Sequence, residues 1–275
     1  MMLLAIVLVL LGLRWLDITP KALGGTGMYV ARLRRLIRSD AFWQKPAAPW
    51  LVLLPPVALL ALIDWKLPWF LHLALALVVL WFTLGPRELA TDLQAWLAAR
   101  GRGDESEAQS RAKALWGERQ PGLGELLIIS HERLFGVLIW FFALGPAGGL
   151  LYRMGRRLPE AWPGDAGHAH AAHAALAYVP ARVTAALFAA AGSAEDVIGE
   201  WRRQRSAAPS SWIERTWNRL SRVAAATLNV EESKGGLAAP PSLEDGAREF
   251  LHLEFRALLI LLALFAIFTV GSWFG

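Results

Sequence analysis

Long apolar runs recur along the chain and constrain its fold more than any other feature. They cover about residues 1–16, 50–63, 68–84, 134–152, 176–191 and 257–273. A helix needs about 20 apolar residues to cross the roughly 30 Å hydrocarbon core of a bilayer. We therefore predict an all-α fold: a polytopic helical membrane protein with cytoplasmic helical segments, built as a single domain over residues 1–275.

Composition agrees with a membrane location. Apolar residues make up 55% of the 275 residues, the mean hydropathy is +0.38, and the 14 Trp are of a type that collects at membrane interfaces. Cysteine is absent, which excludes disulfides, a thiolate nucleophile and Cys-ligated metal centres. The net charge of +5 reflects topology rather than nucleic-acid binding, because the basic residues lie beside the apolar runs.

Charge between the runs predicts which side of the membrane each segment faces. Basic residues are dense in segments 14–45, 87–133 and 202–256, whereas only Lys66 lies in the turn between the second and third runs. The positive-inside rule places the three segments in the cytoplasm and the Lys66 turn outside. We expect a multi-pass membrane protein.

One loop conflicts with this assignment. Arg153, Arg156 and Arg157 follow the 134–152 run, which should end outside. Either this loop is an exception to the positive-inside rule, or the 176–191 run does not cross the membrane fully.

Two runs are open to a second interpretation. Residues 1–16 lack the basic start and small-residue cleavage site of a signal peptide, so we interpret them as a retained membrane helix whose Arg14 end faces the cytoplasm. The runs at 50–63 and 68–84 predict a tight hairpin around Asp64–Leu67, with a re-entrant hairpin as the alternative.

The polar segments 87–133 and 193–255 are predicted to be cytoplasmic and helical. Gly101-Arg102-Gly103-Asp104 should divide the first into two helices. Trp201–Val230 has an amphipathic pattern, with Ser210 or Ser211 as a candidate N-cap.

The most informative polar cluster is Ser130-His131-Glu132-Arg133, at the mouth of the 134–152 run. Charged groups at an apolar helix end need partners. The cluster is either a binding pocket or an interfacial cap in which Arg133 reaches phosphate headgroups.

A second arginine lies inside an apolar stretch. In Tyr178-Val179-Pro180-Ala181-Arg182, Pro180 suits the first turn of a helix, which places Arg182 one turn inside it. Arginine there needs a carboxylate, a phosphate or water, and Glu132 is the natural partner to test.

Two further motifs have competing interpretations. Gly145-Pro146-Ala147-Gly148-Gly149 predicts close helix packing at its glycines, with a ligand-binding break in the helix as the alternative. His168, His170 and His173 indicate an exposed loop rather than a metal site. Phosphate-loop, serine-hydrolase and zinc-protease motifs are absent from the sequence.

The chain resembles the AmpE family of inner-membrane proteins, which modulate β-lactamase induction together with AmpD. The resemblance is carried by 130–135, Trp140-Phe141-Phe142, the stretch from Gly145 to Tyr152 and Arg153, and Tyr178-Val179-Pro180-Ala181-Arg182 followed by Gly192. The motif-level match is confined to about 130–192, while the general layout agrees over nearly the full chain.

AmpE is similar in turn to the CobD/CbiB membrane enzymes, which use ATP to make an amide bond on a corrinoid side chain. Their Glu-Asn-x-x-Asp-Gly stretch falls where this chain has His131 to Gly136, and only Glu132 is a candidate match. An Asn- and Asp-containing stretch is replaced by Met154-Gly155-Arg156-Arg157-Leu158, and an early His-Pro-Val motif is missing. These losses argue against ATP and Mg²⁺ chemistry.

The resemblance implies a non-enzymatic regulator of β-lactamase induction that senses a ligand or the state of the cell wall. A CobD-like enzyme with a degenerate site is the alternative. We expect no cofactor, no catalytic or metal-binding residue and no nucleic-acid partner; the expected partners are the lipid bilayer and an AmpD-like amidase or other cell-wall recycling components. The candidate ligand-binding residues are His131, Glu132, Arg133, Tyr152 and Arg182.

Overall fold

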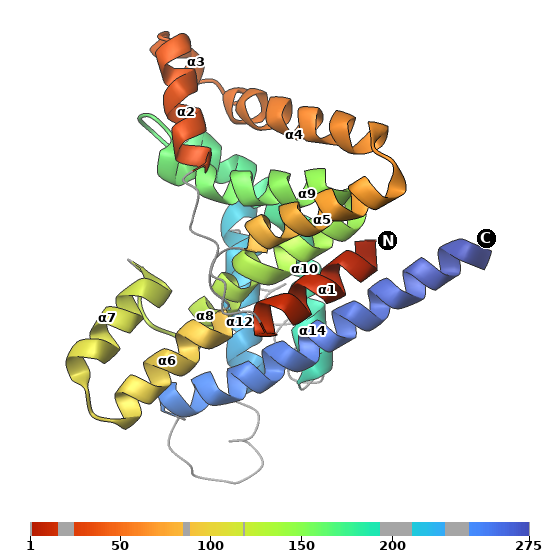
Figure 1. Cartoon of the computed structure of the whole chain (residues 1–275). Helices are drawn as coiled ribbons and strands as arrows, with labels where there is room; N and C mark the ends of the chain where they lie inside the picture. The colour runs from red at the N-terminus through yellow and green to blue at the C-terminus, as the bar shows by residue number, and fades with distance from the viewer. Residues whose placement is uncertain are drawn as a thin grey trace. The chain divides into compact units, whose positions relative to one another are not determined.

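Helices make up the whole regular structure of the described part of the chain in the computed structural model (Figure 1). The structure describes residues 2–15, 25–84, 89–117, 119–192, 211–228 and 242–274. They form two compact units: unit 1 holds Met1–Pro86 with Gly136–Pro180, and unit 2 holds Arg87–Phe135 with Ala181–Gly275. The predicted single domain over residues 1–275 stays a prediction.

Several helices are long and apolar enough to cross a membrane, which confirms the predicted all-α polytopic membrane fold. By length and hydropathy the candidates are Ala48–Lys66, Trp69–Gly101, Leu123–Ala161, Gly167–Ala191 and Leu243–Gly271, with a shorter apolar helix at Met2–Leu13.

Unit 1 contains the N-terminal helices and a long helix from the middle of the chain. Its elements are α1 (Met2–Trp15), α2 (Gly25–Leu36), α3 (Asp40–Trp43), α4 (Ala48–Lys66), α5 (Trp69–Leu84), α9 (Gly136–Ala161) and the first part of α10 (Gly167–Ala191). Helix α9 contacts α1, α2, α4 and α5 and so forms the centre of this unit.

The predicted hairpin of the second and third apolar runs is present. Helix α4 ends at an extended Leu67, and α5 begins at Trp69 (Figure 1). Near the turn, Asp64 Oδ1 lies 2.7 Å from His72 Nδ1, so a polar pair joins the two arms.

Internal prolines in unit 1 leave backbone carbonyls that side chains from other helices satisfy. Pro56 cannot donate to the carbonyl four residues earlier, that of Val52, and the Tyr29 hydroxyl donates to this oxygen at 3.1 Å. Burial raises the pKa of the Tyr29 phenol, so the hydroxyl keeps its proton. In the same way, Pro180 has no N–H to donate to the Leu176 carbonyl, and Trp140 Nε1 donates to this oxygen instead, at 2.9 Å.

Backbone carbonyls at helix ends in unit 1 also accept hydrogen bonds from side chains of other helices. Trp162 Nε1 donates to the Trp43 carbonyl at the end of α3, at 3.2 Å, and the two indoles make an edge contact. A guanidinium N–H of Arg153 donates to the Thr83 carbonyl in the last turn of α5, at 3.1 Å. Long-range donors therefore connect these helix ends to other helices of the unit.

Helix α9 folds back on itself at Gly145, which has a positive φ of 65° inside the helix and precedes Pro146. A Cβ at Gly136 would lie 2.3 Å from Tyr152 Cζ, and one at Gly149 would lie 3.2 Å from Phe141 Cδ2. Residues before the break thus face residues at matching distances after it, as in an antiparallel hairpin. The predicted close packing at the glycines is confirmed, and the helix also breaks at Gly145; that this break binds a ligand stays a prediction.

Unit 2 consists of α6 (Leu89–Gly101), α7 (Glu105–Trp116), α8 (Leu123–Ser130), a π-helical turn η1 (His131–Phe135), the second part of α10, α12 (Trp212–Leu228) and α14 (Leu243–Phe274). The predicted break between α6 and α7 is confirmed, and Asp104 caps α7 by accepting a hydrogen bond from the Glu107 amide at 2.9 Å. Ser211 caps α12, because the Glu214 amide donates to its hydroxyl at 3.1 Å. Ser210 and residues 201–209 lie outside the described residues.

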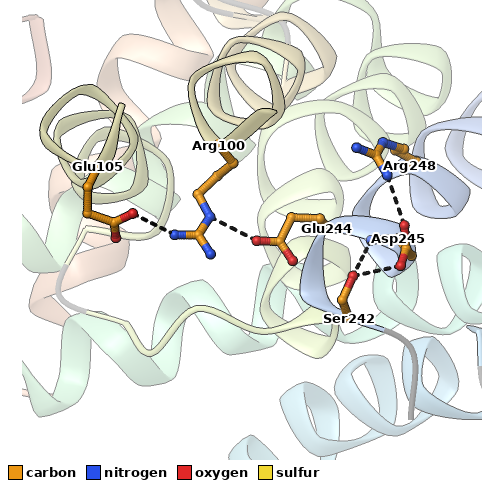
Figure 2. A network of polar contacts seen from close by, with 6 residues as sticks. All are labelled: Arg100, Glu105, Ser242, Glu244, Asp245 and Arg248. Atoms are coloured by element: carbon orange, nitrogen blue, oxygen red, sulfur yellow. Dashed lines mark hydrogen bonds and ion pairs between the residues drawn. The ribbon is translucent and has the colours of Figure 1, made fainter. Parts of the chain in front are cut away.

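An arginine clamp ties three helices of unit 2 together (Figure 2). Arg100 on α6 donates at 2.8 Å both to Glu105 of α7 and to Glu244 in the first turn of α14. Beside it, Ser242 caps α14 by accepting from the Asp245 amide at 3.2 Å. Helix α14 therefore begins at Leu243, well before the apolar run that the sequence marks.

Two sequence interpretations of α10 are wrong. Pro180 does not open this helix; it lies in the interior, because α10 already begins at Gly167. His168, His170 and His173 belong to α10 rather than to a loop, and His173 is buried. An alanine-rich sequence has high helix propensity, which outweighs the loop-like polarity of the histidines.

We expect the Tyr29–Val52 bond to matter only while Pro56 is present. Tyr29→Phe should lower the free energy of unfolding by about 1–3 kcal/mol, because the Val52 carbonyl loses its donor in an apolar setting. In a Pro56→Ala background the cost should shrink, since the restored amide can donate to the same oxygen. Thermal unfolding in detergent measures all four proteins, and equal costs in both backgrounds would contradict this account.

We also expect the α9 hairpin to tolerate no side chain at Gly136. Gly136→Ala should destabilise the protein by about 1–3 kcal/mol, because the methyl group collides with the Tyr152 ring. Gly27→Ala on α2 is the matched control: its Cβ meets nothing within 4 Å, so helix propensity should make it neutral or slightly stabilising. Similar melting temperatures for both variants would show that the arms do not pack as described.

Candidate functional site

The candidate site of unit 2 lies where α8 passes into η1. A π-helical turn is rare and is found frequently at functional sites. Ser130, His131 and Glu132 are buried and Arg133 is half-buried. Each of the four side chains contacts a different element of unit 2, so this turn is the point at which the unit's helices meet.

Ser130 is fully buried and donates its hydroxyl proton to Glu254 Oε1 at 2.5 Å. Glu254 belongs to α14, which is otherwise apolar along its second half, and only 6% of its surface is exposed. A carboxylate so deep in apolar surroundings is costly without a donor. Ser130 therefore ties α14 to α8.

His131 is fully buried between α10 and α12. Its Nδ1 lies 2.9 Å from Thr184 Oγ1, and its ring makes an edge contact with Trp217, at 6.2 Å between centroids. The hydrogen bond fixes the ring orientation, and the surrounding helices hold the imidazole away from bulk solvent. A histidine held in this way is suited to accept or donate a single proton.

Glu132 is paired with Arg119, a residue that follows α7. The guanidinium donates to both carboxylate oxygens, at 3.2 and 3.3 Å, and lies 3.7 Å from Glu125. The Glu132 side chain is 7% exposed while that of Arg119 is 41% exposed. The pair thus has a buried anionic end and a cationic end open to the surroundings.

Arg133 points toward α6 and donates to Asp92 Oδ2 at 3.1 Å, with both side chains mostly covered. Arg133 is therefore held by a carboxylate of the protein itself, while the binding pocket and the interfacial cap both stay predictions. The bidentate geometry that arginine offers to carboxylates also suits phosphates. The site therefore presents two guanidinium groups, each beside a carboxylate.

The other two candidate residues, Arg182 and Tyr152, belong to different units. Arg182 lies half-buried on α10, two residues before Thr184, and its pairing with Glu132 stays a prediction. Tyr152 belongs to unit 1, where its ring covers Gly136 and makes an edge contact with buried His173 at 6.0 Å. The structure therefore gives Tyr152 a packing role within its own unit.

Sequence reasoning missed several partners of the cluster: Asp92, Arg119, Thr184, Trp217 and Glu254. One signal was present, because Glu254 lies just before an apolar run, where a carboxylate is expensive. Nothing in the local pattern marks Arg119 or Asp92, which reach the cluster only through the packing of α6, α7 and α8.

The described residues do not form a group of the kind that holds a metal ion. Within the described ranges, no three His, Asp or Glu side chains come together as a group that could hold a metal ion. The carboxylates of the cluster face Arg119, Arg133 and Ser130 instead. The residues present do not fit a cage that holds Mg²⁺ by protein groups alone.

Comparison with known proteins identifies a biosynthetic relative. The cobalamin biosynthesis protein CobD of Chromobacterium violaceum is 29% identical over 181 residues, which cover 60% of this chain and 57% of the relative. This chain is a distant, partial homologue of CobD. The match spans little more than half of the relative's length. No family model matches the chain, and no solved structure matches it.

This finding corrects the expectation that the chain is not an enzyme. The matched relative is a cobalamin biosynthesis protein, from the group that the sequence resemblance describes as amide-forming enzymes. It supports the CobD/CbiB-like membrane group and does not extend to AmpE or to β-lactamase induction. The relationship to CobD exists although the Asn and Asp of the CobD/CbiB pattern are missing, and in this chain the polar cluster is paired with residues of other segments.

We expect Arg119→Ala to destabilise unit 2, because buried Glu132 loses a charged donor. The loss should be about 1–3 kcal/mol, below the value for a fully buried pair because Arg119 is partly exposed. Arg111→Ala is the control: it breaks an ion pair with Glu107 in which both side chains are half-exposed, which is worth about 0–1 kcal/mol because neither charge is buried. Equal effects in thermal unfolding would mean that Glu132 does not depend on Arg119.

Proposed function

We propose that this chain is a CobD-like membrane enzyme of the bacterial inner membrane that forms an amide bond on a corrinoid. The homology to CobD carries the proposal. The buried cluster at η1 supports it, because ion pairs and a fixed histidine inside a membrane protein are expensive and usually functional. By resemblance to CobD/CbiB enzymes, the substrates are a corrinoid carboxylic acid, an amine and ATP.

The residues of the cluster would then have distinct tasks. Arg119 and Arg133 bind anionic groups of the substrates, since each guanidinium already pairs with a carboxylate of the protein. His131 accepts the proton that the amine loses when it attacks the activated carboxyl group, because its imidazole is held rigidly by Thr184. Glu132 and Asp92 position the two arginines.

ATP would activate the corrinoid carboxylate, as in the enzymes that the chain resembles. Because the described carboxylates do not form a metal cage, no step of this proposal depends on a metal held by the protein. With Glu132 in the glutamate position of the CobD/CbiB pattern, Arg133 stands in place of the Asn and Gly136 in place of the Asp, so we propose a corrinoid or amine that differs from that of those enzymes.

The test is a direct assay of the purified protein in lipid nanodiscs. A corrinoid acid, candidate amines and Mg·ATP are supplied, and amide products are detected by mass spectrometry. His131→Ala should lower turnover by about 10²–10⁴-fold, and Arg133→Ala should raise the KM for the anionic substrate. Arg248→Ala is the matched control, because its ion pair with Asp245 is exposed.

A full-length, folded protein that neither binds a corrinoid nor consumes ATP would contradict the proposal. β-lactamase induction in a deletion strain is the complementary measurement: a change restored by the wild-type gene but not by the His131→Ala variant would assign the cluster to regulation instead. Association with an AmpD-like amidase or cell-wall recycling components can be measured in the same strain.

A further inference from the structure

Arginine is concentrated in the second half of α2 and just after it. The stretch 25–39 contains no Asp or Glu, and its four basic residues are Arg32, Arg34, Arg35 and Arg38. All four are exposed, and none of their side chains makes an ion pair or hydrogen bond with a described residue. Exposed Arg102 and Arg248, by contrast, each pair with a nearby carboxylate. The positive charge of α2 is therefore not compensated by the described part of the protein.

The opposite face of α2 packs against apolar helices of unit 1. Val30, Leu33 and Ile37 follow one another at helical spacing; Val30 is buried and the other two are half-buried. Helix α2 contacts α9, and the Tyr29 hydroxyl donates to the Val52 carbonyl in the second turn of α4. Because α4 is a candidate membrane span, this bond holds α2 at the level where the span begins.

Aromatic residues also gather at this end of α4. Trp43 Nε1 donates to the Ile37 carbonyl just after α2, at 3.1 Å, and the Trp43 indole contacts that of Trp162 edge to face, at 5.1 Å between centroids. Trp50 occupies the first turn of α4. Tryptophan is enriched at membrane–water interfaces, so these residues indicate that the membrane surface lies at this level.

The direction of α2 fits such a surface. Figure 1 shows α2 running across the direction of α4, at the end where α4 begins. When α4 crosses a membrane, a helix in this orientation lies close to the membrane plane, as interfacial amphipathic helices do. The charge pattern of the sequence predicts that this end of α4 faces the cytoplasm.

One exposed face of α2 combines arginines with apolar side chains. Met28, Arg32 and Leu36 follow one another at intervals of four residues, and Arg35 lies beside them. Leu36 is 79% exposed and Met28 is 54% exposed. Such a face suits the boundary between headgroups and acyl chains, because the apolar groups can enter the acyl layer while the guanidinium groups reach the phosphates.

We propose that α2 is an interfacial helix whose Met28–Leu36 face binds the anionic phospholipid headgroups of the cytoplasmic leaflet. Guanidinium groups offer paired N–H donors to a phosphate, and each basic residue near an anionic membrane surface raises the affinity about fivefold. Because Tyr29 joins α2 to α4, lipid binding at α2 fixes the depth of α4 in the membrane. The face belongs to unit 1 and the η1 cluster to unit 2, so the enzymatic proposal is tested separately.

The absence of cysteine allows one fluorescent reporter at a time. The full-length Leu36→Cys protein carries a bimane and is reconstituted in vesicles of mixed phosphatidylglycerol and phosphatidylcholine. A nitroxide that quenches bimane is placed on the upper acyl chain of one lipid or of the other. Leu59→Cys, 60% exposed on α4, is the lipid-facing control, and Gln109→Cys, exposed on α7, is the water-facing control.

Quenching at Leu36→Cys should be stronger when the anionic lipid carries the nitroxide, because that lipid is enriched around α2. It should be equal for the two lipids at Leu59→Cys and absent at Gln109→Cys. Replacing both Arg32→Gln and Arg35→Gln should lower the preference for the anionic lipid by about 10–30-fold. The matched control, Arg102→Gln with Arg248→Gln, makes the same charge change elsewhere and should leave the preference unchanged.

Three results would overturn the proposal. Absence of quenching at Leu36→Cys by either lipid would show that α2 faces water. Equal quenching by the two lipids, or a preference that the Arg32→Gln, Arg35→Gln protein keeps, would show that the arginines do not select anionic lipid. Loss of the preference on adding millimolar inorganic phosphate at constant ionic strength would assign the arginines to a soluble anion instead.

Discussion

The cost of a polar group in an apolar interior governs the structure of both units. In unit 2 this cost falls on Ser130, His131, Glu132 and Arg133, which occupy consecutive positions of one buried turn. The turn over His131–Phe135 is π-helical, and each of the four side chains contacts another element of the unit. The arrangement of unit 2 follows from this requirement: α14 meets Ser130, α10 meets His131, and α6 meets Arg133.

Unit 1 meets the same requirement with backbone rather than charged groups. Prolines inside α4 and α10 remove hydrogen bonds that apolar surroundings would make expensive to lose, and Tyr29 and Trp140 replace them. At each of these prolines, a side chain from another helix donates to the carbonyl that the proline cannot reach. Glycine has the complementary effect in α9, because missing side chains at Gly136 and Gly149 let Tyr152 and Phe141 approach the backbone.

The chemistry proposed for the chain depends on which buried charges are paired with one another. Glu132 and Asp92 are engaged with arginines, which keeps the guanidinium groups in fixed positions while leaving Arg119 partly exposed. A site of this type is organised before a ligand binds, so an anionic substrate would exchange for a carboxylate partner rather than order the side chains anew. The distant relationship to CobD is consistent with an altered motif whose partners come from other helices.

The sequence by itself determined the all-α class with apolar helices long enough to span a membrane, the α4–α5 hairpin, the division between α6 and α7 and the presence of a polar cluster at Ser130–Arg133. These features depend on apolar length, on local turn residues and on the cost of buried charge, all of which are local properties. Tertiary structure alone decided the partners Arg119, Asp92 and Glu254, which lie up to 124 positions away from the residues they contact. It also placed Pro180 inside α10 and folded α9 into a hairpin, because a helix break bends the chain back only where neighbouring helices supply donors and space for the returning arm.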